Sequence, residues 1–135
     1  MVDLTTVVIA SDVDVVTARQ AGRELAAQVG FSAGDQTVVA AAISEIARNI
    51  LMYARRGEVE LRIAVEADRS GVIVVATDQG PGIADVERYM QDGVSTSGGL
   101  GLGLGGSKRL VDEFLIDSVP GKGTKITMKK WRRRV

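Results

Sequence analysis

Two polar side chains on one predicted helix, Glu45 and Asn49, are the first candidates for chemistry. Residues four apart lie on the same face of a helix, and this face borders the apolar stripe. There, a carboxylate and a carboxamide can share one hydrated cation and the phosphate groups that the cation binds. The pair alone leaves a second interpretation open, a solvated glutamate beside a surface asparagine, because charged residues on helices are mostly exposed.

A second candidate is Asp78, which directly follows an apolar run and precedes the sequence Gln-Gly-Pro-Gly at residues 79–82. An aspartate at the end of a strand can accept a hydrogen bond from an amino group such as that of adenine. The two glycines allow a sharp turn and the close approach of a flat ligand. A plain turn is the alternative, since this pattern alone is common in loops.

The third candidate is a glycine-rich segment from Ser97 to Lys108, in which six of the nine residues at 98–106 are glycine. Its free N–H groups, placed ahead of a helix N-terminus, suit phosphate groups, and its leucines argue against a flexible linker. The dinucleotide-binding fingerprint does not apply, because no strand precedes these glycines. A P-loop is excluded because Ser107 and Lys108 reverse the order that it requires.

The amino-acid composition excludes several classes of enzyme. The chain has no histidine and no cysteine, so it cannot contain a Ser-His-Asp triad, a cysteine nucleophile or an ordinary zinc site. Any general base must therefore be a carboxylate, a lysine or a tyrosine. An ordinary protein-kinase domain is excluded as well, because its catalytic loop needs a histidine and its length exceeds that of this chain.

Length and charge indicate one cytoplasmic domain. The 135 residues fit a single domain at 1–135, since domains typically have about 100–200 residues. Seventeen basic and seventeen acidic residues cancel, so no overall field favours nucleic acid or a membrane. No apolar run approaches the roughly 18 residues of a membrane span and no signal peptide is recognisable, so we expect a soluble protein of the cytoplasm. The basic residues at 129–134 indicate a solvated tail.

The elements that must position the candidates can be predicted from periodicity. A strand at 4–9 precedes a helix to about residue 29, whose apolar residues near helical spacing are Val13, Val16, Ala21, Leu25 and Val29. Gly30 ends this helix, and Ser32 caps a second helix that runs to about residue 54. The apolar stripe of the second helix comprises Val39, Ile43, Ile46, Ile50 and Tyr53.

The second half of the chain is rich in predicted strands. Residues 58–66 alternate apolar and polar side chains, and a turn at 68–71 leads to a more continuously apolar strand at 72–77, which we expect at the centre of the sheet. A long glycine-rich loop follows, with a weak helical turn at 86–90, then a helix at about 105–114 and a hairpin of strands at 115–119 and 124–130. This order predicts an α+β fold, a two-layer sandwich with helices on one face of a mixed, mostly antiparallel sheet and with the long loop as a lid.

Together, the three candidates resemble the N, G1 and G2 boxes of the GHKL (Bergerat-fold) ATPase superfamily, and Gly123-Thr124 resembles its G3 box. The match is closer with RsbT-type switch kinases of the bacterial stressosome, which are relatives of the anti-sigma-factor kinases. The segments that carry it are 44–49 (Ser-Glu-Ile-Ala-Arg-Asn), 78–83, 92–101 and 108–114. The resemblance spans about residues 5–130.

This resemblance implies a role for each matching residue. Asp78 would bind the adenine amino group with support from Thr124, and Gly80 and Gly82 would shape the adenine pocket. Asn49, with Glu45 beside it, would bind the Mg²⁺ that accompanies ATP or ADP, and Glu45 would also polarise the attacking hydroxyl. The residues that would surround the phosphates are Gly99, Gly101, Leu102, Gly103, Leu104 and Gly105, with Lys108 and Arg48 as further phosphate or transition-state charges.

The activity that the resemblance implies is that of a serine/threonine protein kinase acting on STAS-domain scaffold proteins of a stressosome. Phosphoryl transfer consists mostly of positioning and charge neutralisation, so little further machinery is needed. The phosphorylated scaffold would release the kinase to activate a downstream phosphatase-type effector. The alternative is a nucleotide-gated binding protein, similar to an anti-sigma factor, that transfers little or no phosphate.

Overall fold

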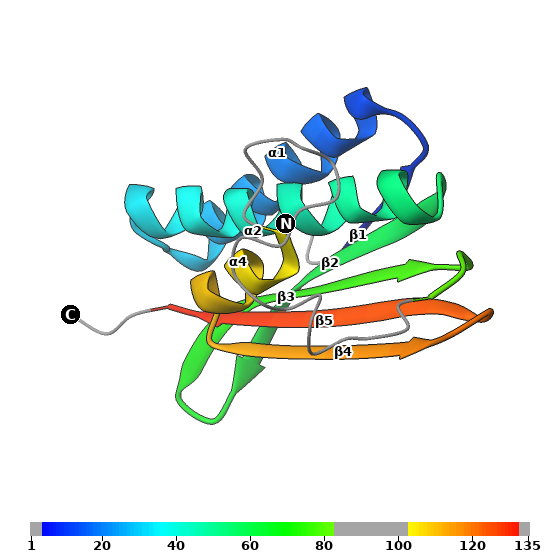
Figure 1. Cartoon of the computed structure of the whole chain (residues 1–135). Coiled ribbons are helices and arrows are strands. Elements are labelled where there is room, and N and C mark those ends of the chain that lie inside the picture. The colour runs from blue at the N-terminus through cyan, green and yellow to red at the C-terminus, as the bar shows by residue number, and fades with distance from the viewer. Residues whose placement is uncertain (1–3, 83–102, 133–135) are drawn as a thin grey trace.

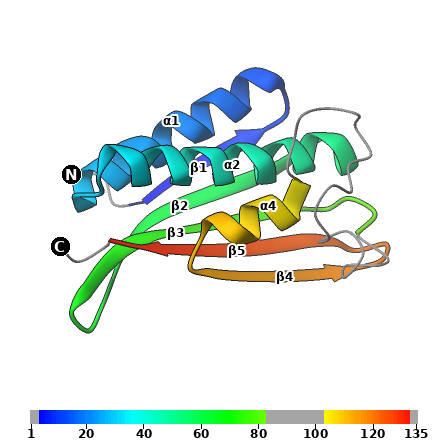
Figure 2. The same cartoon turned by 60° about the vertical axis from the view of Figure 1, so that its left-hand side comes forward.

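The computed structural model describes residues 4–82 and 103–132, which form helices and strands in two layers (Figure 1). In chain order the elements are β1 (Leu4–Ile9), α1 (Asp12–Val29), α2 (Ala33–Tyr53), β2 (Gly57–Glu66), β3 (Arg69–Asp78), α4 (Gly103–Leu110), β4 (Glu113–Val119) and β5 (Gly123–Trp131). The helices cover one face of the sheet in both views (Figures 1 and 2). The predicted two-layer α+β sandwich is thereby confirmed.

The sheet has the strand order β1-β2-β3-β5-β4, with β3 at its centre as predicted. All neighbouring strands pair antiparallel, which corrects the expectation of a mixed sheet for the described residues. Two features explain this. Hairpins join β2 to β3 and β4 to β5, and the antiparallel helices α1 and α2 return the chain to the end of β1, where Ile9 lies opposite Gly57.

The hairpin between β2 and β3 is tighter than predicted. The expected turn at 68–71 is shortened to two residues between Glu66 and Arg69, with Ala67 in the left-handed region at φ 51°. Gly71, which favoured a turn in the sequence, lies within β3 opposite Trp131. A Cβ atom built at Gly71 would lie 2.7 Å from the Trp131 ring, so this glycine makes room for an indole.

The predicted stripe of α1 is confirmed in its second half, where Leu25 is buried and Ala21 and Val29 pack against the core, and is wrong in its first half. Val13 is 71% exposed and Val16 is also exposed, and the buried residues are Val15, Ala18, Gly22, Leu25 and Ala26. A Cβ atom at Gly22 would overlap the Ile43 side chain of α2, so α1 packs closely through its small residues. Small residues carry little hydrophobic signal, and the periodicity therefore favoured the two valines.

Helix α2 follows its predicted pattern. Val39, Ile43, Ile46 and Ile50 are buried in the core, and Tyr53 is half-buried. The side chain of Ser32 caps the helix by accepting a hydrogen bond from the Asp35 N–H at 3.1 Å. Within residues 4–82 and 103–132, no helix combines the length and the apolar character needed to cross a membrane.

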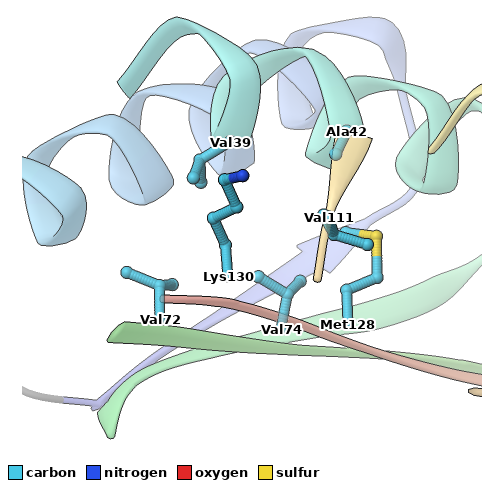
Figure 3. Close-up of a pocket in the computed structure, with 7 residues that line it drawn as sticks. All are labelled: Val39, Ala42, Val72, Val74, Val111, Met128 and Lys130. Atoms are coloured by element: carbon cyan, nitrogen blue, oxygen red, sulfur yellow. The ribbon is translucent and has the colours of Figure 1, made fainter. Parts of the chain in front are cut away.

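A small cavity of about 10 Å³ lies between α2 and the sheet (Figure 3). It is lined by Val39, Ala42, Val72, Val74, Val111, Met128 and Lys130. Its volume is close to the minimum for one water molecule, and its lining is apolar except for Lys130, which extends from β5 toward α2. This space belongs to the core and is too small for a nucleotide.

Helix α4 is shorter than predicted at its C-terminal end. The sequence favoured a helix at 105–114, whereas the helix spans 103–110 and β4 already begins at Glu113. Hydrogen bonds to β5 end the helix at this point. The Asp112 N–H donates to the Lys129 carbonyl at 3.0 Å, and the Asp112 carboxylate accepts from the Trp131 backbone N–H at 2.7 Å. The weak helical turn expected at 86–90 lies outside the described residues.

Candidate functional site

Asp78 is the last residue of β3 and is only 7% exposed. Its Oδ1 accepts a hydrogen bond from the Gly80 N–H at 2.9 Å, which turns the chain after the strand. Among the described residues no hydrogen bond engages the other oxygen, Oδ2, and none of their fully buried side-chain oxygens lacks a partner. Oδ2 can therefore accept a hydrogen bond from a ligand amino group.

Thr124 lies directly opposite Asp78 in the pairing of β3 with β5 and is buried. Its hydroxyl oxygen is 2.9 Å from the hydroxyl oxygen of Ser118 on β4. Gly123 has φ 106°, and a Cβ atom there would overlap the Asp78 carbonyl oxygen. The hairpin thus places Thr124 on the strand next to Asp78 and Ser118 on the strand beyond it. Sequence reasoning missed Ser118, because only the register of β4 with β5 brings it to Thr124.

The turn after β3 fits between α2 and the turn that joins β4 to β5. A Cβ atom at Gly80 would lie 2.6 Å from the Ala54 Cβ at the end of α2. Gly82 has φ 76°, where a Cβ atom would overlap the Val119 carbonyl oxygen. The Gly121 N–H also donates to the Pro81 carbonyl at 2.7 Å. Both predicted glycines are therefore required at this end of the sheet, independently of any ligand.

The C-terminal half of α2 carries the other polar candidates. Asn49 is buried and Glu45 half-buried, whereas Arg48 is exposed and forms an ion pair with Glu45. The interpretation of a surface asparagine is therefore wrong. The next residue, Ile50, shares a neighbour with Asp78: a Cβ atom at Gly57 would lie 2.8 Å from Ile50 Cγ2 and 3.2 Å from Asp78 Cβ. Helix α2 thus reaches the same end of the sheet as Asp78.

A surface hollow of about 310 Å³ runs along α2 between α1 and α4. This volume is at the lower end of the range for ligand pockets, about 300–1,000 Å³. Glu45 and Arg48 contribute to its lining, together with Arg19 and Arg23 of α1. The hollow therefore offers access to the Glu45 carboxylate from the helical side of the molecule.

The predicted phosphate-binding residues divide into two groups. Gly103, Leu104 and Gly105 belong to α4, and the residues that lie outside the described part of the chain are Gly99, Gly101 and Leu102. Lys108 is exposed on α4. The buried Ser107 donates its hydroxyl to the Ala42 carbonyl of α2 at 3.4 Å. The segment after the glycines is thus fastened to the helix that carries Glu45 and Asn49.

The described residues include no cluster of three or more acidic side chains that could hold a metal ion without help. A Mg²⁺ ion that arrives with a nucleotide needs only one or two protein ligands, because phosphate and water oxygens complete its octahedron. The Asn49 carboxamide and the Glu45 carboxylate, one turn apart on α2, fit such a small set of oxygen donors.

Comparisons with known proteins agree with this geometry. The model of the histidine kinase-like ATPase domain matches residues 9–130. The chain is 48% identical over 133 residues to the serine/threonine-protein kinase RsbT of Bacillus subtilis strain 168, covering 98% of this chain and 100% of that protein. It is 29% identical over 119 residues to the anti-sigma F factor of Thermoanaerobacter sp. strain X514, covering 84% of this chain and 82% of that protein.

Two solved structures share the fold. The RsbU and RsbW domains of Rv1364c from Mycobacterium tuberculosis superpose with a TM-score of 0.66 at 20% identity, over 98% of this chain. This chain covers 34% of that longer protein. The mycobacterial sensor histidine kinase MprB superposes with a TM-score of 0.56 at 19% identity, over 99% of this chain and 100% of that one. At these identities the structures support the fold alone.

Proposed function

The chain belongs to the histidine kinase-like ATPase family and is a serine/threonine protein kinase, and we propose that its acceptor is a hydroxyl of a STAS-domain protein. Kinases need a nucleotide site, a group that orients the acceptor hydroxyl and neutralisation of the phosphate charge. The described residues offer candidates for each of these parts at one end of the sheet and on α2.

The nucleotide site that we propose is centred on Asp78. Its Oδ2 accepts a hydrogen bond from the adenine amino group, and Thr124 supports that contact through its hydroxyl. Gly80 and Gly82 form the turn beside the base. The phosphates are bound by Lys108 and the glycine-rich segment, whose proposed binding residues are Gly99, Gly101, Leu102, Gly103, Leu104 and Gly105.

Asn49, with Glu45 beside it, would hold the Mg²⁺ ion of Mg-ATP. The ion, when bound, neutralises charge on the phosphate oxygens. The carboxamide is suited to this task because it is a neutral oxygen donor held in place by burial.

Glu45 is proposed as the group that orients the acceptor hydroxyl. A bond forms between the acceptor oxygen and the γ-phosphorus, the bond to the bridging oxygen of ADP breaks, and the acceptor proton passes to Glu45. The observation that carries this assignment is the half-buried Glu45 carboxylate on α2, one turn from the buried Asn49. Burial restricts the carboxylate to one side of the site, as a positioned base requires.

We further propose that the kinase is a partner-switching regulator in the cytoplasm, without nucleic-acid or membrane partners. Its substrates are STAS-domain scaffold proteins of a stressosome, and their phosphorylation releases it to activate a phosphatase-type effector. The balanced charge of the chain fits protein partners better than nucleic acid. The similarity to anti-sigma F factors supports a regulatory role.

That same similarity favours a second candidate, a nucleotide-gated binding protein with little or no phosphotransfer. The two candidates differ in one observable. A kinase converts its partner into a phosphoprotein, whereas a gated binding protein only changes its affinity for the partner when ATP replaces ADP.

The proposal is tested with Mg-ATP and a purified STAS-domain protein from the same organism, by following phosphoserine and phosphothreonine. Glu45→Ala should lower transfer by about 10²- to 10⁴-fold, the usual contribution of a general base, and should keep ATP binding. Glu60→Ala, an exposed glutamate on β2, is the control and should transfer at the wild-type rate. Normal transfer by Glu45→Ala would remove Glu45 from the mechanism, and tight ATP binding by a wild type that transfers nothing would favour the second candidate.

A further inference from the structure

Glu45, the proposed base, forms an ion pair with Arg48, whose side chain is much more exposed. Arg48 Nη1 lies 3.2 Å from Glu45 Oε1, one helical turn away, and the side chains are 52% and 15% exposed, respectively. Among the described residues, Arg48 is the one partner recorded for this carboxylate. The exposed arginine can therefore leave at little cost, while the half-buried glutamate keeps its place.

The ion pair at Glu45 affects how fast ATP is hydrolysed by water before the partner protein binds. The lone pair of Oε1 that accepts the guanidinium hydrogen bond is not available to a second donor, so the ion pair keeps this oxygen from an attacking hydroxyl. If Glu45 were free before the partner arrived, it could activate water instead of the acceptor hydroxyl. The water oxygen would then bond to the γ-phosphorus, the bond to the bridging oxygen of ADP would break, and the water proton would pass to Glu45. ATP would be lost as ADP and phosphate.

The hollow along α2 indicates what could remove Arg48. Its charged lining consists of three arginines, Arg19, Arg23 and Arg48, and a single carboxylate, Glu45. No ion pair of the described residues engages Arg19 or Arg23. The hollow is therefore positively charged and complementary to an acidic segment. A carboxylate that enters it competes with Glu45 for Arg48.

We propose that Arg48 is a positioning residue that holds Glu45 until an acidic segment of the phosphoacceptor protein enters the hollow and takes Arg48 over. The inference rests on the proposed role of Glu45 as the base. It assigns Arg48 a different task from that of a transition-state charge, and it names the partner chemistry, a carboxylate close to the acceptor hydroxyl. Arrival of the correct partner and release of the base become a single event.

The strength of the pair sets the size of the effect. Exposed or half-exposed pairs at this helical spacing change equilibria only modestly, so release of Glu45 should raise water attack by about two- to five-fold. The pair thus biases the base without blocking it, and a docked carboxylate can displace it readily.

The test compares Arg48→Ala with the wild type in two assays. Hydrolysis of Mg-ATP without any partner should rise about two- to five-fold, while the KM for a purified STAS-domain protein rises and phosphotransfer at low partner concentration falls. Arg48→Lys keeps the charge and should restore both values toward the wild type. Arg62→Ala, an exposed arginine on β2, is the matched control and should change neither.

In Arg48→Ala, ATP hydrolysis is expected to rise while phosphotransfer falls, and these opposite changes distinguish a positioning role from structural damage. A variant that is merely misfolded loses hydrolysis and transfer together, and this result would overturn the inference. Unchanged hydrolysis, or an unchanged KM for the STAS-domain protein, would overturn it as well. In the double variant Glu45→Ala/Arg48→Ala the rise in hydrolysis must vanish, because Glu45 is the group that Arg48 restrains.

Failure of the proposed function gives a different pattern. A wild type that hydrolyses ATP but phosphorylates no STAS-domain protein would contradict the acceptor assignment, whatever Arg48→Ala does. A wild type that phosphorylates the STAS-domain protein normally, with no rise of hydrolysis in Arg48→Ala, would contradict only the role of Arg48.

Discussion

The two ends of the β3–β5 pair differ in how their polar groups are used. At the far end, where β3 begins, Arg69 stacks over the Trp131 ring at 3.9 Å and forms ion pairs with Glu66 and Glu113. The Trp131 indole N–H also donates to Glu113 at 2.8 Å. The charges of Arg69, Glu66 and Glu113 are therefore neutralised within the chain.

The site end, where β3 finishes at Asp78, has the opposite character. Asp78 makes no ion pair among the described residues, and none of their hydrogen bonds engages its Oδ2. Thr124 lies opposite Asp78, and its hydroxyl contacts that of Ser118 on the next strand. Backbone turns pack here where side chains would collide. The comparison separates an end that stabilises the sheet from an end that retains polar groups for a ligand, as is typical of functional sites.

Among substitutions that test the difference between the two ends, Gly123→Ala at the site end is expected to have the largest effect. The substitution places a Cβ atom on the Asp78 carbonyl at a positive φ, so it should destabilise the fold by about 2–4 kcal/mol and lower ATP affinity. Gly121→Ala is the matched control, because Gly121 also has a positive φ but has nothing within 4 Å of its Cβ position. It should cost about 1 kcal/mol. Chemical denaturation of both variants measures the difference, and equal losses would contradict the close packing at the site end.

A more selective change at the same end is Asp78→Asn. The amide can keep the turn but loses the charge and turns a donor toward the ligand amino group, so ATP affinity should fall by about 10- to 100-fold. Titration calorimetry with ATP measures this loss. Asp117→Asn on β4 is the control, an exposed aspartate near the same end of the sheet, and should bind ATP normally. If Asp78→Asn also binds ATP as the wild type does, the nucleotide site lies elsewhere.

Much of the fold could be predicted because its pattern is local. The stripe of α2 and the alternation of β2 each follow from one period. The stripe is confirmed, and the alternation holds through Val59, Leu61 and Ile63 but ends before Val65, which is exposed near the hairpin. The prediction for α1 was wrong at Val13 and Val16, because the buried face of the helix is decided by neighbouring elements: Gly22 lies against Ile43 of α2 and Leu61 of β2. The predicted C-terminal end of α4 was wrong for a similar reason, because hydrogen bonds to β5, and not a local signal, end the helix at residue 110.

The candidate site was predictable as a set of residue types and not as an arrangement. Asp78 and Thr124 are far apart in the sequence and meet only through strand register. Ser118 carries no motif, and its hydroxyl becomes relevant only beside Thr124. The ion pair of Arg48 with Glu45 lies within one helix turn, yet no spacing rule distinguishes it from a pair of unrelated surface charges.

The smallest effect is expected at the far end, from Trp131→Phe. Phenylalanine keeps a ring beneath Arg69 but removes the hydrogen bond from the indole to Glu113, so the free energy of unfolding should fall by about 1 kcal/mol. Because Trp131 is the single tryptophan of the chain, unfolding of this variant is followed by circular dichroism rather than by fluorescence. ATP affinity should stay at the wild-type value, since the site end retains every group described for it. A clear loss of affinity in a variant that is no less stable would show that the two ends are coupled, and the separation of their roles would then be wrong.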